Sequence, residues 1–289
     1  SFQHVIENTV ISLINKLLLT HKEITQVFLS GGLFHNSKLV GEITRKISTK
    51  ILVSPSPGDG GSSIGAAYFA ALCLNKNHTN ENSNPFLGPK IPDIKEYSHL
   101  FALLKVKSTY SKILELLSAD ESFAVFSGYS EIGPRALLSR SICCNAKSEI
   151  ALKRLNIKIK KREAFRPIAP VINKKYLYEN FEFNENSIQN SFWMGQLIWP
   201  KNNIKLKEQP FYHVDKSVRA QVFDHESELH KKFIPLILQR LLNEGHIIAN
   251  TSLNIAGDPM VFIPEDLYIN CKRLEIKYVL QDELLYEVL

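Results

Sequence analysis

The sequence has few cysteines, and their spacing fits neither a disulfide framework nor a zinc site. The four are Cys73, Cys143, Cys144 and Cys271. No two of them form a C-x-x-C pair, and the adjacent Cys143 and Cys144 are poorly placed to bridge one another. This pattern excludes a small disulfide-stapled secreted domain, and we expect a reducing, cytoplasmic environment.

Long apolar runs and targeting signals are also missing. Residues 1–21 lack the cationic, hydrophobic and cleavage regions of a signal peptide. Lys16 interrupts their apolar run, and no later segment reaches the ~20 apolar residues of a membrane span. We therefore expect no membrane partner. Because Ser1 opens directly into a helical pattern, we also expect that the chain begins within a larger protein.

A strong charge imbalance is absent too. The net charge of +6 and the pI near 9.0 favour anionic ligands such as nucleotides. No basic strand carries interleaved aromatic residues, so we expect no nucleic-acid partner. With 44% hydrophobic and 22% charged residues, the chain is typical of a globular protein. Its 289 residues allow one large domain or two ordinary ones.

The first 75 residues alternate between helix and strand patterns. Apolar residues recur at helical spacing from Phe2 to Leu18, which predicts an amphipathic helix over 2–20. The further predicted elements are a strand at 23–29, a helix at 36–47, a strand at 50–54 and a helix at 63–74. Glycine-rich turns follow both strands, and their backbone N–H groups could face a phosphate. On spacing alone, ordinary turns explain these glycines equally well.

A segment rich in Asn, Pro and Ser, residues 75–98, gives the clearest boundary signal. We therefore predict a first domain over 1–75, a linker over 76–98 and a second domain over 99–289. In the second domain the predicted elements are strands at 123–126, 191–199 and 246–249, a helix with surface loop over 173–190, a helix starting near Pro264 and two short strands within 272–289.

A basic stretch, residues 128–170, dominates the second domain. Ten lysines and arginines lie between Arg135 and Arg166, and prolines flank both of these arginines. Proline stiffens the backbone, and a stiffly held guanidinium suits bidentate binding of phosphate or carboxylate. A solvated helix face is the simpler interpretation for part of the set: Lys153, Arg154, Lys158 and Lys161.

Two segments of this stretch resemble a known family. GYSEIGPRALLSRS is similar to the G-x-x-E-x-G-P-R-A-L-G-x-R-S motif, and LNIKIKKREAFRPIAP to the LN-x-x-I-K-x-R-E-x-F-R-P-x-A-P motif, of the NodU-type O-carbamoyltransferases. Leu138 replaces the usual glycine, and residues 145–147 replace a usual Ala-Asp-Pro-Arg run. Motifs of the same family recur in order along nearly the whole chain.

For the first domain, the resemblance implies the end of an actin-like domain. SGGLFHNSKL is similar to S-G-G-V-x-x-N-x-x-L, so Gly31, Gly32 and Asn36 are expected to line a nucleotide and acceptor cleft. SPSPGDGGSSIGAA is similar to P-x-x-G-D-x-G-x-x-x-G-A-A, whose aspartate, here Asp59, is implied to bind Fe²⁺ or a similar divalent ion. One carboxylate cannot make such a site alone, and a tight Gly-Asp-Gly turn is the alternative interpretation.

The resemblance implies an α/β protein as a whole, and for the second domain a YrdC-like α+β fold. The pairing of K-x-R with S-x-N is similar to the signature of domains that make carbamoyl or threonylcarbamoyl adenylates. The implied catalytic residues are Lys160, Arg162, Arg166, Ser252 and Asn254. The implied carbamoyl phosphate and ATP ligands are Arg135, Arg140, His213, Asp215, Arg219, Asn250 and Thr251. A hairpin with a satisfied His–Asp hydrogen bond is the alternative for His213 and Asp215, and an Asn/Ser-rich turn for residues 250–254.

The implied function is O-carbamoyl transfer. ATP with Mg²⁺ and carbamoyl phosphate form carbamoyl-AMP in the second domain, and the carbamoyl group passes to a hydroxyl-bearing small molecule in the first. The alternative is a catalytically incomplete nucleotide-binding fragment, or a subunit of a split enzyme with an upstream partner chain. We expect the cations at 135, 160, 162, 166 and 219 to converge with the polar groups near 252 around one anion-sized hollow.

Overall fold

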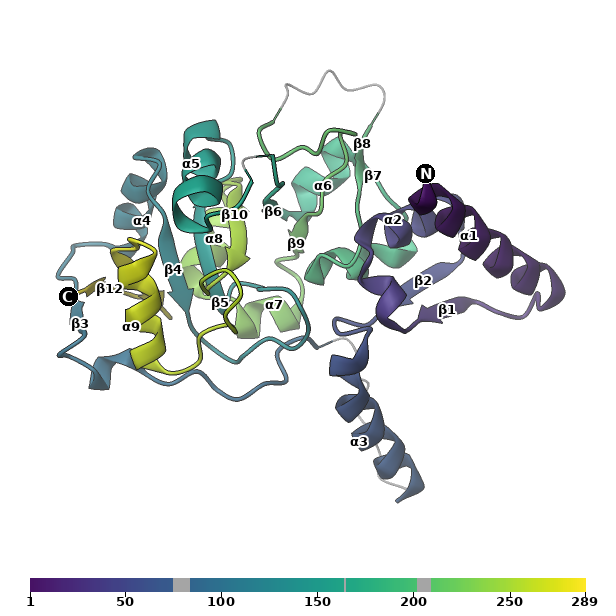
Figure 1. Ribbon diagram of the computed structural model, residues 1–289, viewed down its shortest axis with the longest axis horizontal. Helices are drawn as coiled ribbons and strands as arrows, with labels where there is room; N and C mark the ends of the chain where they lie inside the picture. Colours follow the sequence, from purple (N-terminus) through teal and green to yellow (C-terminus); the bar gives the residue numbers. More distant parts are fainter. Residues whose placement is uncertain (75–83, 164, 202–208) are drawn as a thin grey trace.

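The computed structural model describes residues 1–74, 84–163, 165–201 and 209–289. Residues 76–83 of the predicted linker lie outside this description. In the described part the chain folds into two packed units, a small one at the N-terminus and a larger one built on an eight-stranded sheet (Figure 1). The expected α/β class is confirmed. No described helix has the length and apolarity required to cross a bilayer.

The small unit is a two-stranded parallel sheet with helices around it. Its core contains Leu39, Ile43 and Ile51, which are fully buried, and the helix predicted over 2–20 is confirmed. Asn36 begins the second helix by accepting a hydrogen bond from the N–H of Leu39. The elements are α1 (Phe2–Thr20), β1 (Gln26–Leu29), η1 (Gly32–His35), α2 (Ser37–Lys46), β2 (Lys50–Val53), η2 (Asp59–Gly61) and α3 (Ser62–Cys73).

The large unit contains a mixed sheet with strand order β3-β12-β11-β4-β5-β10-β6-β9. Side chains alternate between its two faces: Phe123 and Val125 of β4 enter one core, and Ala124 and Phe126 enter the other. The strands are β3 (Phe101–Leu103), β4 (Phe123–Phe126), β5 (Arg140–Asn145), β6 (Ala169–Asn173), β9 (Gln221–Phe223), β10 (Ile248–Ser252), β11 (Tyr278–Gln281) and β12 (Leu284–Val288).

Helices cover both faces of this sheet. Those packed in the core with Phe123 include α4 and α8, and those in the core with Phe126 include α5, α6 and α9. The predicted helix start at Pro264 is confirmed, because proline lacks the N–H that a first helical turn leaves unpaired. The helices are η3 (Ile94–Glu96), α4 (Thr109–Ser118), α5 (Glu149–Lys153), the π-helical η4 (Arg154–Ile159), α6 (Lys174–Asn180), α7 (Glu228–Phe233), α8 (Leu236–Asn243) and α9 (Pro264–Arg273).

The strand predicted over 191–199 is wrong. Its first residues belong to the 3₁₀-helix η5 (Glu185–Trp193). Trp199–Pro200 (β8) pairs with Phe181–Glu182 (β7), and Ile198 forms an isolated antiparallel bridge with Val218. The reason is a partner distant in sequence. The Asn190 side chain accepts from Val53 N–H and donates to the Ile51 carbonyl, both at 2.9 Å, and so closes the outer edge of β2. These hydrogen bonds attach the small unit to the large one.

Candidate functional site

Three arginines surround a hollow of about 130 Å³ at one end of the large sheet. Arg135 comes from the loop between β4 and β5, Arg162 follows η4, and Arg219 precedes β9. The opposite lining comes from the end of β10, where Asn250, Thr251 and Ser252 stand in sequence. We call this cavity, defined by the three arginines and residues 250–252, the arginine hollow.

Arg219 is the most deeply buried of the three. Its Nε is enclosed and has no hydrogen-bond partner among the described residues, and the same holds for Oδ1 of Asn250. Burial, with the neighbouring charges of Arg135 and Arg162, lowers the pKa of Arg219 to about 9. Burial also lowers the pKa of Arg135 and of Arg162.

No acidic side chain forms a salt bridge with these three arginines in the part of the chain that the structure describes, although the charge of Glu163 acts on Arg162. Neither Arg135, Arg162 nor Arg219 takes part in a salt bridge there, although Arg162 Nε donates to Asn156 Oδ1 at 2.8 Å. Burying cations without a counter-charge is costly unless a ligand supplies one. The arginine hollow is therefore built to hold an anion.

Lys160 connects the two halves of the K-x-R and S-x-N pattern. Its Nζ lies 2.7 Å from the Asn254 carbonyl, 2.9 Å from Asn254 Oδ1 and 3.0 Å from the Ser252 carbonyl. Burial and the charge of Arg162 lower its pKa to about 8. Lys160 lines a neighbouring cavity of about 300 Å³, so its ammonium shapes the end of β10 from the side next to the arginine hollow.

Local backbone geometry explains why Lys160 and Arg162 serve different cavities. The π-helical turn ends at Lys160, whose N–H donates to the Leu155 carbonyl, and Lys161 then adopts a left-handed conformation with φ of 46°. This reversal directs Arg162 to the arginine hollow and leaves Lys161 exposed.

Two predicted arginines lie elsewhere. Arg140 is held by Glu131, with Arg140 Nε 3.0 Å from Oε2, and their side chains are only 11% and 0% exposed. Arg166 is 59% exposed, and its Nε is 3.9 Å from Glu163. Neither lines the arginine hollow. Arg140 stabilises the loop that carries Arg135, and Arg166 lies at the surface.

His213 and Asp215 occupy a turn beside the small unit. They do not form the hydrogen bond that the hairpin alternative required: His213 Nδ1 lies 3.0 Å from Ser217 Oγ, and Asp215 lies 2.7 Å from Lys38 Nζ. Burial raises the pKa of Asp215, but hydrogen bonds from Lys38 and Ser217 outweigh it and bring the pKa to about 2. Burial lowers the pKa of His213. Asp215 therefore contributes to the contact between the units, and His213 bonds within its own turn.

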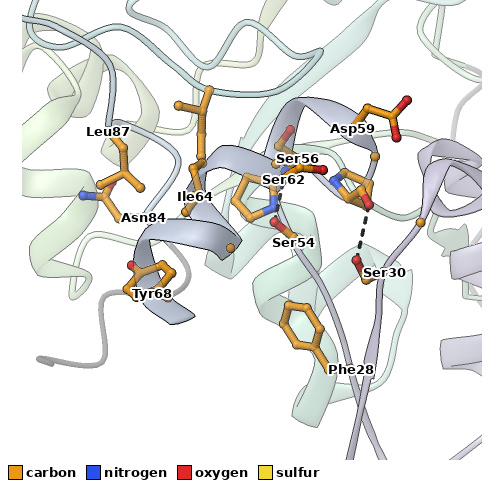
Figure 2. Close-up of a pocket in the computed structure, with 17 residues that line it drawn as sticks. Phe28, Ser30, Ser54, Ser56, Asp59, Ser62, Ile64, Tyr68, Asn84 and Leu87 are labelled. Carbon is orange, nitrogen blue, oxygen red and sulfur yellow. Dashed lines mark hydrogen bonds between the residues drawn. The ribbon is translucent and has the colours of Figure 1, made fainter. Parts of the chain in front are cut away.

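A larger cavity of about 550 Å³ lies in the small unit (Figure 2). Phe28 and Ser30 from β1 and the following turn stand on one side of it, and Ile64 and Tyr68 of α3 on another. Gly31 also lines it, with a φ of 112° that favours glycine, and its N–H donates to the Pro57 carbonyl at 2.7 Å. We call this cavity the glycine-turn cavity.

Of the residues predicted for the nucleotide and acceptor cleft, Gly31 lines the glycine-turn cavity, whereas Gly32 and Asn36 do not; Asp59, the predicted metal ligand, also lines it. Asn36 donates to Gln3 Oε1 at 2.8 Å and caps α2. The carboxylate of Asp59 points away from the other labelled side chains (Figure 2). Nowhere among the described residues do three His, Cys, Asp or Glu side chains gather as metal ligands. The predicted metal therefore does not fit the residues present unless ligands come from elsewhere.

A small hollow of about 10 Å³ borders both cavities. It shares Pro55 and Pro57 with the glycine-turn cavity, and Arg135 and Met194 with the arginine hollow. Arg135 Nη2 approaches the carbonyl of His35 at 3.5 Å there.

The sequence predicted no role for Glu131, His35 or η5. Only Glu131 had a signal, since it stands inside the GYSEIGPR segment.

Two family models match the chain. The one described as "Carbamoyltransferase C-terminus" covers residues 114–287, and the one described as "Carbamoyltransferase N-terminus" covers residues 1–68. Together they include both cavities, apart from the residues between the two matches.

Curated relatives carry related names. "Uncharacterized protein sll1178" of Synechocystis is 27% identical over 320 residues, covering 96% of this chain and 50% of the relative. "Nodulation protein U" of Azorhizobium caulinodans is 31% identical, covering 72% of this chain and 35% of its own length. The "3'-hydroxymethylcephem-O-carbamoyltransferase" of Streptomyces clavuligerus is 29% identical, and the match covers 79% of this chain and 42% of the relative. The chain thus spans half or less of the length of these relatives.

Solved structures give more distant matches. Full-length HypF in its phosphate- and nucleotide-bound form has a TM-score of 0.42 at 15% identity, covering 60% of this chain and 21% of that one. A variant of P. abyssi Sua5 has a TM-score of 0.38 at 18% identity, and the match covers 62% of this chain and 49% of that one.

Proposed function

The chain belongs to the carbamoyltransferase family, and from that membership we propose that it acts as an O-carbamoyltransferase that uses ATP and carbamoyl phosphate. The large unit forms carbamoyl-AMP, and the carbamoyl group then passes to a hydroxyl of a sugar or natural-product acceptor in the small unit. Mg²⁺ accompanies ATP as its counter-ion.

One observation carries this proposal: the uncompensated cations of the arginine hollow. Arg135, Arg162 and Arg219 face a cavity of about 130 Å³ with no carboxylate partner among the described residues. A phosphate group would supply the missing negative charge and an acceptor for Arg219 Nε. Guanidinium groups bind such oxyanions through paired N–H donors.

The proposed first reaction begins with hydrolysis of carbamoyl phosphate, which releases phosphate and carbamate. A carbamate oxygen then attacks the α-phosphorus of ATP, the bond from that phosphorus to the bridging oxygen of the β-phosphate breaks, and pyrophosphate leaves. Negative charge builds up on the α-phosphate oxygens during the attack, and fixed cations stabilise it without further reorganisation. We assign that role to Arg219 and Arg162, and hydrogen bonding to the carbamoyl group to Thr251 and Ser252, because all four line the arginine hollow.

The second reaction is proposed for the glycine-turn cavity. The acceptor hydroxyl oxygen attacks the carbamoyl carbon, the hydroxyl proton is released and AMP leaves. The cavity of about 550 Å³ is large enough for a small-molecule ligand, and the small hollow beside Arg135 shares lining residues with both cavities. We assign no step to a metal at Asp59, because its further ligands lie outside the described residues.

Mass spectrometry tests the proposal directly. The chain is incubated with ATP, carbamoyl phosphate and Mg²⁺, and carbamoyl-AMP and pyrophosphate are measured. We expect both products from the wild type and from Lys158→Ala, whose side chain is exposed on η4. Absence of both products from the folded chain, with nucleotide still bound, would instead favour the alternative of a nucleotide-binding subunit of a split carbamoyltransferase. The half-length match to the relatives is the observation that keeps this alternative open.

A further inference from the structure

The side-chain amide of Asn250 has a fixed orientation beside the arginine hollow. Its Nδ2 donates to the carbonyl of Ala136 at 2.8 Å and to Oε1 of Gln221 at 2.7 Å. A reversed amide would place its oxygen against the carbonyl oxygen of Ala136, and two acceptors at that distance repel each other. Asn250 is only 2% exposed, and its Oδ1 has no hydrogen-bond partner among the described residues. The amide therefore leaves a buried acceptor open at a cavity that Asn250 lines.

Gln221 holds this amide from outside the arginine hollow. It is the first residue of β9, it is 1% exposed, and it is not among the residues that line the hollow. Its Nε2 is directed at the carbonyl of Leu137 at 3.4 Å, so its Oε1 faces Asn250. Strand β6 lies between β9 and β10, and its residue paired with Asn250 is Ala169. The two amides thus meet across a strand that presents only a methyl side chain at that position.

An open acceptor is unexpected in a cavity built for an anion. The three guanidinium groups of the arginine hollow are donors, and the hydroxyl groups of Thr251 and Ser252 can donate or accept. The amide oxygen of Asn250 can only accept, and a phosphate oxygen offers it no hydrogen. A ligand that combines an oxyanion with an N–H donor satisfies both kinds of group. A carbamoyl group attached to phosphate has this combination, whereas an acetyl group in its place does not.

We propose that Gln221 is a positioning residue, which keeps Oδ1 of Asn250 directed at the hollow so that it accepts an N–H of the carbamoyl group and selects carbamoyl over acetyl ligands. The inference rests on the proposed function and adds a source of specificity to it. When the Gln221 acceptor is removed, one N–H of the Asn250 amide loses its partner, and the negative charge of a bound phosphate attracts it. The amide then turns a donor towards the anion and no longer distinguishes an amino group from a methyl group.

Two stable ligands isolate this contact. Phosphonoacetamide has a carbamoyl NH₂ group, and acetonylphosphonate has a methyl group in its place, while the carbonyl and the phosphonate are the same in both. Calorimetric titration of the full chain with each ligand gives two dissociation constants, and their ratio is the readout. A loss of phosphonate affinity or of structure weakens both ligands alike. A change in the contact with Asn250 alters the ratio.

Three substitutions separate positioning from a general effect of burial. Gln221→Met removes the acceptor with little change in volume. Gln221→Glu retains an acceptor for Asn250 Nδ2, and its added charge acts equally on both phosphonates, so the ratio is preserved. Gln239→Met is the matched control, because Gln239 is a buried glutamine of α8 that donates to the carbonyls of Lys231 and Ile234. Circular dichroism and urea unfolding show that each variant is folded.

We expect the wild type, Gln221→Glu and Gln239→Met to bind phosphonoacetamide at least about 10-fold more tightly than acetonylphosphonate, because the methyl group leaves the buried Oδ1 unpaired. In Gln221→Met the preference should fall below about 3-fold, with acetonylphosphonate binding unchanged or tighter.

The inference is overturned by a wild type that binds neither ligand or both equally, by a preference that persists in Gln221→Met, or by one that Gln221→Glu or Gln239→Met also loses. The wild-type ratio tests the Asn250 contact even where Gln221→Met does not fold. Loss of the preference together with intact pyrophosphate release from ATP and carbamoyl phosphate contradicts this inference alone. An intact preference without pyrophosphate release contradicts the proposed function instead.

Discussion

The carboxylate of Glu131 organises the loop that presents Arg135, through its contact with Arg140. Oε2 of Glu131 accepts from Arg140 Nε at 3.0 Å, and Oε1 accepts from the N–H groups of Leu137, Ser139 and Arg140 at 2.8, 3.0 and 3.1 Å. Glu131 and Arg140, both in the GYSEIGPRALLSRS segment, thus hold the loop that carries Arg135. The guanidinium of Arg140 pairs with Glu131, whereas that of Arg135 lines the arginine hollow.

Replacing Glu131 by glutamine should lower the free energy of unfolding by about 3 to 5 kcal/mol, because Arg140 then becomes a buried cation without its partner. Urea unfolding measures the change. Glu149→Gln is the control, since Glu149 and Lys153 form an exposed pair whose loss should leave the free energy of unfolding nearly unchanged. Equal stability of Glu131→Gln and wild type would contradict a framework role for Glu131.

Arg219→Met should separate stability from function. Removing a buried, uncompensated cation should raise the free energy of unfolding of the ligand-free protein by about 1 kcal/mol or more. Pyrophosphate release should fall by about 100-fold or more, because the variant lacks a donor for the charge on the α-phosphate. Lys158→Met, at an exposed position, should change neither the free energy of unfolding nor pyrophosphate release. An Arg219→Met variant that releases pyrophosphate at the wild-type rate would show that the arginine hollow is not the site of the reaction.

The buried ammonium of Lys160 should make the free energy of unfolding increase as pH rises above about 8. Its pKa is about 8 in the folded protein, lowered from 10.5 by burial and by Arg162. Between these values the unfolded chain binds more protons than the folded one, so the contribution of Lys160 to stability increases as pH rises.

We therefore expect the unfolding free energy of the wild type, relative to Lys160→Met, to increase by up to about 1.4 kcal/mol per pH unit from about pH 8 to pH 10. Urea unfolding at a series of pH values checks this. Parallel profiles for the two proteins would mean that the pKa of Lys160 is not lowered.

Asn190→Ala should loosen the small unit although Asn190 belongs to the large one. The substitution leaves Val53 N–H and the Ile51 carbonyl of β2 without partners, at a cost of about 2 to 4 kcal/mol in unfolding free energy. Hydrogen exchange should show faster exchange of the Val53 amide than in Gln189→Ala, the neighbouring control. Unchanged exchange at Val53 would indicate that η5 does not close the strand edge.

Much of the fold was predictable where local patterns decide it. The helix over 2–20 and the helix at Pro264 follow from apolar spacing and from the backbone preferences of proline, and both were predicted. The segment 191–199 failed because its apolar run suggested a strand, while its neighbours Ser187 and Asn190 form hydrogen bonds with β2 more than 130 positions away. Periodicity contains no information about such a partner.

The candidate site divides in the same way. The motifs predicted which cations belong to a phosphate site, and Arg135, Arg162 and Arg219 do line one cavity with Asn250, Thr251 and Ser252. The motifs did not reveal that Arg140 faces Glu131, that Asn36 caps a helix or that Arg166 lies at the surface. A motif fixes which residue types occur and in what order, but a side chain's partner depends on the packing around it.

The amino-acid sequence by itself determined the family, the alternation of helices and strands, and the supply of positive charge, because each of these is written in local spacing and residue type. The tertiary structure alone decided which guanidinium groups stay free to meet an anion. It also placed two cavities from separate units side by side. Those outcomes depend on contacts between residues far apart in the chain, where burial and the presence or absence of a counter-charge set the energy of each group.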